Sequence, residues 1–175
     1  MEKPPLPRPA LILLCAALIL IWGSAFTFVG VAVDHISPYW LTAWRLVVGA
    51  SALTFYALIT GHRFPPLIDK RWRWYGVLGL TGAVIPFLLM AKGQLRVDSG
   101  LTAVIVGAMP LITIVLAHFF TDERLTPFKV LGFLLGFLGV AVLFMPEEFS
   151  FGLTDSWKAQ LIILCAACCY AGTTV

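Results

Sequence analysis

Residues 11–17 read LILLCAA and residues 161–167 read LIILCAA, so the opening of the first apolar segment recurs at the start of the last one. In both segments an aromatic residue and small residues follow, as Trp22-Gly23-Ser24 and as Tyr170-Ala171-Gly172. Seven similar apolar residues also arise by chance, but the matched position at the start of a segment favours a repeat. We therefore interpret the chain as one five-helix repeat followed by the beginning of a second.

The composition is that of an integral membrane protein. Hydrophobic residues make up 60% of the 175 residues and charged residues 12%, whereas a soluble domain has about 45–50% and about 25% respectively. All four cysteines lie in apolar stretches, as buried thiols do, and not in the polar loops of a disulfide framework. Three of them are close in sequence but lack a fourth ligand, so we expect no metal site and no cofactor.

Membrane-spanning helices need about 20 mostly apolar residues. The chain has six such stretches, joined by short polar connections that force neighbouring helices to run antiparallel. The predicted fold class is all-α, a polytopic membrane helix bundle made of a five-helix inverted-repeat unit and an incomplete sixth helix. The predicted spans are Ala10–Val33, Tyr39–Thr60, Trp74–Ala91, Ser99–Phe120, Pro127–Met145 and Trp157–Val175.

These boundaries divide the chain into four parts. We expect a cytoplasmic tail at 1–9, a transmembrane repeat at 10–145, an external loop at 146–156 and the start of a second repeat at 157–175. The first apolar run is longer than the apolar region of a signal peptide, which has about 7–15 residues. We also expect the natural protein to continue past the last residue with four more spans.

The positive charges predict the orientation. With the N-terminus inside, the cytoplasmic flanks carry eight Lys and Arg residues and the outer flanks carry three. By the positive-inside rule this places the N-terminus in the cytoplasm and the chain in the inner or plasma membrane. Five crossings leave the chain on the opposite side, so a second copy of the repeat would insert upside down. Inverted repeats of this kind are common in secondary transporters.

Arg45 lies well inside the second predicted span, six residues or roughly 9 Å of helix after Tyr39. A charge in the hydrocarbon costs about 2.5–3.5 kcal/mol on insertion scales, so such residues face the bundle or a cavity. We interpret Arg45 as a substrate-binding residue that anchors an anion, for instance a carboxylate. Two other interpretations stay open: the side chain extends to the outer surface, or it donates to backbone carbonyls of a neighbouring helix.

Five further side chains near mid-depth are candidates for the same substrate site. An indole can stack on a substrate or fill the bundle, and hydroxyls more often donate to their own helix backbone than to a ligand. These candidates are Trp22, Ser24, Thr27, Thr102 and Thr113.

Pro86 and Pro110 lie near the middle of the third and fourth predicted spans. Each removes a backbone hydrogen bond and bends its helix, and carbonyls freed at mid-membrane are tolerated where they line a cavity. We predict that the two bent helices form part of a gate. A static kink that serves packing is the alternative.

Several short motifs, in order along the chain, resemble a known family. They are Trp22-Gly23-Ser24-Ala25-Phe26, Pro38 followed by Arg45, Met109-Pro110-Leu111, Asp122-Glu123-Arg124-Leu125-Thr126, and the pair Gly132 and Gly139. In this order and spacing they are similar to the EamA-like members of the drug/metabolite transporter superfamily. Two features depart from the family pattern: Asp122 stands where glycine is frequent, and the end of the third span is unusually polar, with Lys92, Gln94 and Arg96.

The resemblance implies a ten-helix carrier of two repeats that moves small metabolites such as amino acids out of the cell. The expected function is therefore secondary-active export by alternating access between inverted repeats, with the lipid bilayer, a small-molecule substrate and the second repeat as partners. Glycine stripes such as Gly132-x-x-x-Gly136 let helices approach closely, and a homodimer contact is a second use for them. The alternative function is a structural or assembly membrane protein complete at six helices.

Other functions are disfavoured by what the spans contain. No Asp or Glu lies in a predicted span, and neither H-E-x-x-H nor a nucleotide-binding G-x-x-x-x-G-K-[ST] loop is present, so we expect no enzyme. The basic and aromatic residues 71–74 fit an anionic lipid surface without any nucleic acid. The substrate and the coupling ion are left open by the sequence.

Overall fold

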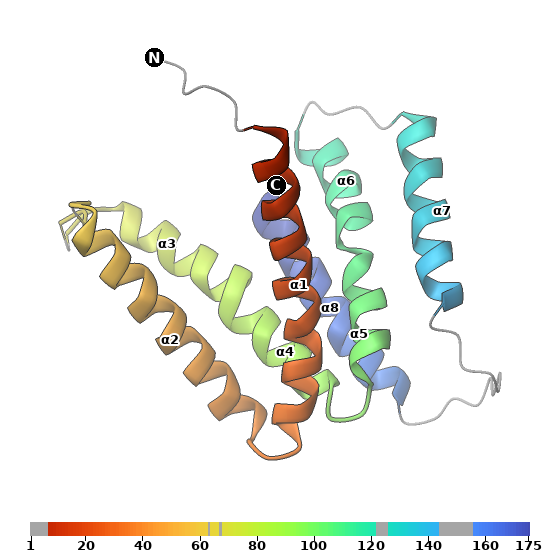
Figure 1. The fold of residues 1–175 in the computed structure, drawn as a ribbon, viewed down its shortest axis with the longest axis horizontal. Helices are drawn as coiled ribbons and strands as arrows, with labels where there is room; N and C mark the ends of the chain where they lie inside the picture. The colour runs from red at the N-terminus through yellow and green to blue at the C-terminus, as the bar shows by residue number, and fades with distance from the viewer. Residues whose placement is uncertain (1–6, 63, 67, 122–125, 144–155) are drawn as a thin grey trace.

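The computed structural model describes residues 7–62, 64–66, 68–121, 126–143 and 156–175. All regular structure in these ranges is helical, which confirms the predicted all-α bundle (Figure 1). The tail before Pro7, the turn motif at 122–125 and the loop at 146–155 lie outside the described residues. The elements are α1 (Arg8–Val33), α2 (Pro38–Ile59), α3 (Arg71–Gly79), the π-helical turn η1 (Leu80–Val84), α4 (Ile85–Gly93), α5 (Ser99–Gly107), α6 (Met109–Phe120), α7 (Pro127–Leu143) and α8 (Ser156–Thr174).

Four helical segments among the described residues are long and apolar enough to cross a membrane. They are Arg8–Val33, Pro38–Ile59, Arg71–Gly93 and Ser99–Phe120, and they coincide with the first four predicted spans. The third consists of α3, η1 and α4, and the fourth of α5 and α6. The fifth and sixth predicted spans correspond to α7, of 17 described residues, and to α8, whose first turn carries the polar Lys158.

Because successive spans run antiparallel, the bundle has two ends (Figure 1). We call the end where α1 begins the proximal end, and the end with residues 33–38 and 93–99 the distal end. Most buried apolar side chains lie in the distal half, while Ala117 and Ala171 are buried proximally, where α6 packs on α8. Among the side chains that the structure describes, the other buried apolar residues are Val29, Val33, Met90, Ala91, Val97, Val104, Ala159, Ile163, Ala166 and Ala167.

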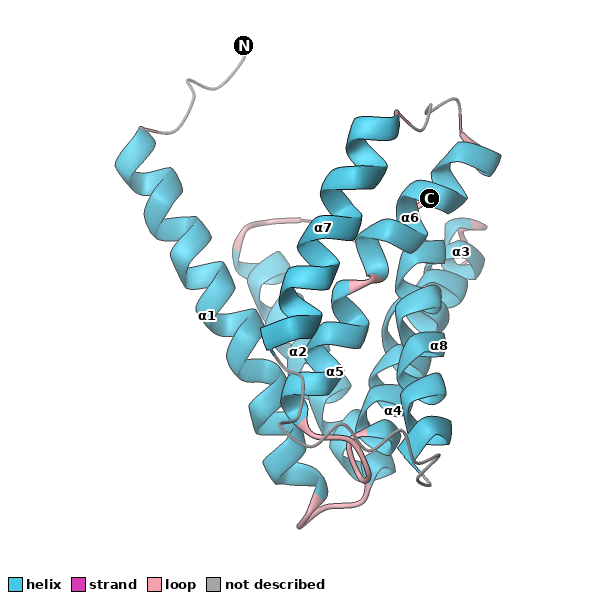
Figure 2. Cartoon of the chain, turned by 90° about the vertical axis from the view of Figure 1, so that its right-hand side faces the viewer, coloured by secondary structure: helices cyan, strands magenta, loops and turns pink. Residues whose placement is uncertain are grey.

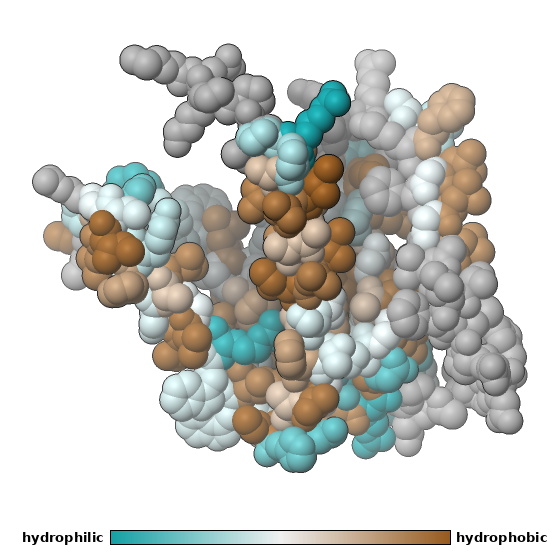
Figure 3. Space-filling view, in the orientation of Figure 1, coloured by the Kyte–Doolittle hydropathy of each residue, from teal (hydrophilic) through white to brown (hydrophobic). Residues whose placement is uncertain are grey.

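The proximal halves of α1, α2 and α3 make few contacts with the rest of the bundle. Every residue from Leu11 to Ser24 is exposed, and so are residues 47–56 and 71–80. Figure 1 shows α2 and α3 diverging from α1 toward this end, and Figure 2 shows α1 leaning away from the other helices. The surface over α1 is strongly hydrophobic (Figure 3), and a patch of this extent belongs against lipid or another apolar surface rather than water.

The third span is interrupted by a π-helical turn at the predicted bend. Proline has no backbone N–H, and its ring crowds the carbonyl four residues earlier. Just before the buried Pro86 the helix widens, and the N–H of Ile85 donates to the carbonyl of Leu80. The fourth span breaks before Pro110, which occupies the first turn of α6, where a missing N–H is tolerated. The gating role of both prolines stays a prediction.

Two glycines of the third span let α8 approach closely. A Cβ atom built on Gly93 would overlap the side chain of Ile163, and one on Gly82 would lie 3.3 Å from both Cγ2 and Oγ1 of Thr173. The segment predicted to open a second repeat therefore packs directly along the third span.

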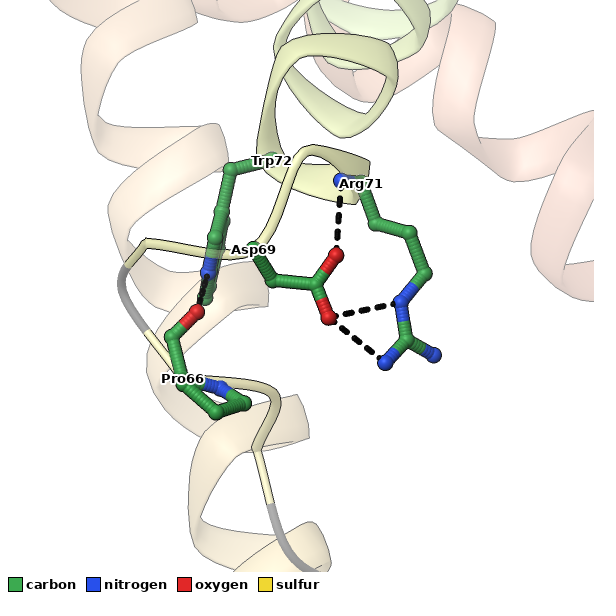
Figure 4. A network of polar contacts seen from close by, with 4 residues as sticks. All are labelled: Pro66, Asp69, Arg71 and Trp72. Atoms are coloured by element: carbon green, nitrogen blue, oxygen red, sulfur yellow. Dashed lines mark hydrogen bonds and ion pairs between the residues drawn. The ribbon is translucent and has the colours of Figure 1, made fainter.

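The turn before α3 is held by one carboxylate (Figure 4). Asp69 accepts from the backbone N–H of Arg71 at 2.9 Å through Oδ1, and from its Nε and Nη2 at 3.0 and 2.7 Å through Oδ2. The indole Nε1–H of Trp72 donates to the carbonyl of Pro66 at 2.9 Å. These hydrogen bonds from Arg71, the side-chain ones first, hold the pKa of Asp69 below its usual value.

We expect this turn to loosen in acid. Because the pKa of Asp69 is lower in the folded protein, its carboxylate stabilises the turn above the pKa of the unfolded chain, and this contribution is lost as the pH falls through the folded pKa. The protection factor of the Arg71 amide against hydrogen exchange should drop as the pH falls below the ordinary pKa of an aspartate, about 3.9. Asp69→Ala, which has no side-chain acceptor, should show low protection throughout, and a wild-type protection factor that does not change with pH would contradict the assignment.

Candidate site between α2, α4 and α8

The guanidinium group of Arg45 lies between helices rather than at the bundle surface. Its Cζ atom is 4.2 Å from the centroid of the Phe87 ring in α4. That ring meets Tyr170 of α8 edge-on, with centroids 6.4 Å apart. Phe87 precedes Gly93, the last residue of α4, by six positions, so the guanidinium lies about 9 Å from the distal end of that helix. Three helices that are distant in sequence meet at this charge.

Two buried polar atoms at this place have no hydrogen-bond partner among the described residues. They are Nη1 of Arg45 and Oγ1 of Thr42. The two side chains are three residues apart, so they share one face of α2, and Thr42 is only 5% exposed. Sequence reasoning missed Thr42, although its spacing from Arg45 was a usable signal.

The same face of α2 carries a second cation contact nearer the distal end. The Nζ atom of Lys92, in the last turn of α4, is 4.7 Å from the centroid of the Tyr39 ring. Residues 39, 42 and 45 therefore form one stripe that faces α4. Two cationic side chains, Arg45 from α2 and Lys92 from α4, therefore lie along the contact between these helices.

No carboxylate of the described residues balances this charge. Asp34 follows α1, Asp69 pairs with Arg71, and Asp98 caps α5 by accepting from the backbone N–H of Leu101. All three lie outside the helical spans, and the pair of Asp69 and Arg71 is the one ion pair found in the described ranges. Arg45 is thus a half-buried cation without a counter-ion in this part of the protein.

The other predicted site residues lie elsewhere in the bundle. Trp22 and Thr27 are exposed on α1. The hydroxyls of Ser24, Thr102 and Thr113 donate to carbonyls three or four residues earlier in their own helices, at 2.9 to 3.1 Å. These five are on α1, α5 and α6, whereas the Arg45 site is formed by α2, α4 and α8. Their role in binding stays a prediction.

We expect Thr102→Val to leave ligand binding within about twofold of wild type. Its hydroxyl already donates to the Asp98 carbonyl at 2.9 Å, so its one hydrogen is not free for a ligand. Valine has nearly the same shape, and loss of one local hydrogen bond lowers stability by about 0.5–1.5 kcal/mol. A tenfold or larger loss of affinity, with unfolding changed by no more than that, would place Thr102 in the substrate site.

Gln94 is a second polar residue whose contacts sequence reasoning did not predict. It is 7% exposed, and its Nε2 donates to the backbone carbonyl of Phe26 in α1 at 3.0 Å. Its Oε1 has no partner among the described residues. The amide thus joins the end of α4 to α1 at the distal end of the bundle.

Comparison with known proteins agrees with this architecture. Residues 9–145 match the EamA-like transporter family. The chain belongs to this family. It is a multi-pass membrane protein, and the family is one of transporters rather than enzymes, as the sequence predicted.

Several curated proteins are similar to the chain. It is 28% identical over 137 residues to an uncharacterized transporter of Archaeoglobus fulgidus, covering 75% of this chain and 46% of that protein. It is 29% identical over 151 residues to the uncharacterized transporter YdfC of Bacillus subtilis, with 86% and 47% covered. The uncharacterized inner membrane transporter YedA of Escherichia coli is 27% identical over 156 residues, with 85% and 47% covered. The chain thus spans about half the length of the curated relatives that it matches. No solved structure matches significantly.

Proposed function

We propose that the protein is a secondary-active transporter that exports small metabolites, such as amino acids, by alternating access. The observation that carries the proposal is the uneven packing of a transporter-family repeat. Its distal half is closed by buried contacts among α1, α2, α4, α5 and α8, whereas the proximal halves of α1, α2 and α3 are exposed. Alternating access needs a bundle that packs at one end while the other end is free to open.

The distal contacts are two small apolar clusters between helices, and each can form or separate as a whole. One cluster joins Val29 and Val33 of α1 to Ala91 of α4, and a second joins Val97 to Ala159 and Ile163 of α8. Few polar bonds cross between helices here, so opening this end exposes apolar surface and breaks little else. We propose that the second repeat provides the partner surface for the proximal halves in the opposite state.

The positive charges give the proposed orientation of this state in the membrane. With the N-terminus in the cytoplasm, the proximal end faces the cytoplasm, and the packing seen here would admit a substrate from inside the cell. That is the loading state of an exporter. Cysteine labelling from each side of the membrane, at exposed positions such as Ser37 and Thr60, tests this orientation, because only Ser37→Cys should react from outside.

Transport itself is tested with the protein as its gene encodes it. Reconstituted in proteoliposomes, it should release preloaded labelled metabolites from a panel of amino acids and nucleosides faster than empty vesicles, with dependence on an ion or substrate gradient. Release that no gradient changes would exclude secondary-active export. If no member of the panel moves in either direction, the protein is better explained as a structural membrane component.

A further inference from the structure

We propose that Arg45 and Thr42, beside the rings of Phe87 and Tyr170, form a binding site for the carboxylate of a small organic acid or amino acid. This inference rests on the proposed transport function and names the substrate class for it. It depends on contacts between α2, α4 and α8 that neither the family match nor the names of the relatives describe.

The first argument is the missing counter-charge. A guanidinium taken into a low-dielectric bundle is expensive unless a negative group and hydrogen bonds compensate it. Among the described residues no carboxylate reaches Arg45, and its Nη1 has no acceptor. A bound anion would supply both the negative charge and the hydrogen-bond acceptor that Arg45 lacks.

The second argument is the geometry of the guanidinium contact. A cation over an aromatic ring uses the face of the guanidinium plane, whereas hydrogen bonds use its N–H edge. The Cζ atom of Arg45 lies over the Phe87 ring, 4.2 Å from its centroid. The Nη1 edge is left without an acceptor. An edge of two parallel N–H groups matches the two oxygens of a carboxylate in the same plane.

The third argument comes from Thr42. The residue is 5% exposed, and its buried Oγ1 bonds neither to its own helix nor to any other described residue. The other described threonines of the spans whose bonds are given donate to a nearby backbone carbonyl, as Thr81 and Thr102 do. A free hydroxyl one turn from the guanidinium on the same face can donate to the same bound carboxylate.

The surroundings favour a single carboxylate on an apolar or aromatic body. Phe87 and Tyr170 present ring surfaces, and the next cation, Lys92, already contacts the ring of Tyr39. A doubly charged phosphate would need a second free cation at the same point. The rings instead suit the hydrocarbon part of a monocarboxylate.

The test compares acids with their uncharged amides. The whole protein, purified in detergent, is titrated with phenylacetate and phenylacetamide, and with isovalerate and isovaleramide, by calorimetry. We expect at least one acid to bind tenfold or more tightly than its amide, because only the acid can compensate Arg45. Equal affinities within both pairs would overturn the proposal, and so would inorganic phosphate displacing the bound acid at equal concentration.

The variants then assign the contact. Arg45→Lys keeps the charge but loses the planar fork, and should weaken binding of the acid about tenfold without changing the affinity for the amide. Thr42→Val should weaken it about threefold to fivefold. Arg96→Lys is the matched control, since it makes the same change at an exposed arginine of the distal turn and should have no effect. An Arg45→Lys protein that binds the acid like wild type overturns the proposal.

The result also separates this inference from the proposed function. If an acid binds through Arg45 but is never moved across the bilayer, the site stands and the transport function fails. If transport occurs but its substrates bind equally well to the Arg45→Lys protein, transport stands and the carboxylate site is wrong.

Discussion

Gly93→Ala is expected to lower the free energy of unfolding by about 1–3 kcal/mol, which is the usual penalty for inserting atoms into a well-packed core. A Cβ at this position would overlap Cγ1 of Ile163, lie 2.8 Å from its Cδ1 and lie 3.2 Å from the backbone oxygen of Ala159. Ile163 is 0% exposed, so its side chain has no free space to move into. The distal ends of α4 and α8 would therefore have to separate.

A second glycine provides the control with the opposite expected sign. A Cβ on Gly49, in the middle of α2, meets no atom within 4 Å. Gly49→Ala should stabilise the protein by up to about 1 kcal/mol through helix propensity alone. Thermal unfolding of both variants in the same detergent compares them directly. A Gly93→Ala protein as stable as wild type would mean that α8 does not pack on α4 in this way.

A compensating substitution, Ile163→Ala, tests whether the two residues are in contact. Ile163→Ala removes the atoms that the new Cβ would overlap, at the cost of a cavity when it is made alone. The double variant Gly93→Ala/Ile163→Ala should lose less unfolding free energy than the sum of the losses in the two single variants, because the two residues are in contact. Additive losses would indicate that the two sites do not touch.

The arrangement of the spans could be predicted from sequence because it depends on length and hydropathy. Apolar runs of about 20 residues set the helix ends to within a few positions, as the predicted Tyr39–Thr60 and the observed Pro38–Ile59 show. Pro86 likewise indicated an irregular helix, since its chemistry is local. The widening into a π-helical turn before it could not be predicted, because a proline does not always have this effect: the fourth span breaks before Pro110 without one.

The candidate site was only partly predictable. Arg45 stands out in sequence because a charge interrupts an apolar run, but its neighbours Phe87 and Tyr170 are ordinary aromatic residues in their own spans. Only the packing of three helices brings them together. Trp22 was a candidate by its motif, yet α1 is apolar on every side and its sequence does not indicate which face meets a neighbour; that indole is 66% exposed.

Gln94→Glu is expected to destabilise the distal end strongly near neutral pH. Gln94 donates its amide N–H to the carbonyl of Phe26 and is 7% exposed. A carboxylate has no donor, so two acceptors would face each other with little access to water. A buried group left without its partner costs about 1–3 kcal/mol, and more when it is charged. We expect α1 to detach from the end of α4, and thermal unfolding to shift accordingly.

Gln94→Leu distinguishes the effect of a buried charge from the effect of losing the hydrogen bond to Phe26. The Phe26 carbonyl lies inside α1, where the helix already supplies a donor, so leucine removes only the interhelical bond, together with the unpartnered Oε1. Interhelical hydrogen bonds in membrane bundles contribute about 0.6 kcal/mol on average, so Gln94→Leu should be mild and independent of pH. The Gln94→Glu variant should recover stability toward about pH 4, where a protonated carboxyl can donate to Phe26 as the amide does. Equal losses in the two variants, unchanged by pH, would show that Gln94 does not join α4 to α1 through this hydrogen bond. A large loss confined to Gln94→Glu would instead identify residue 94 as the polar contact that closes the distal end.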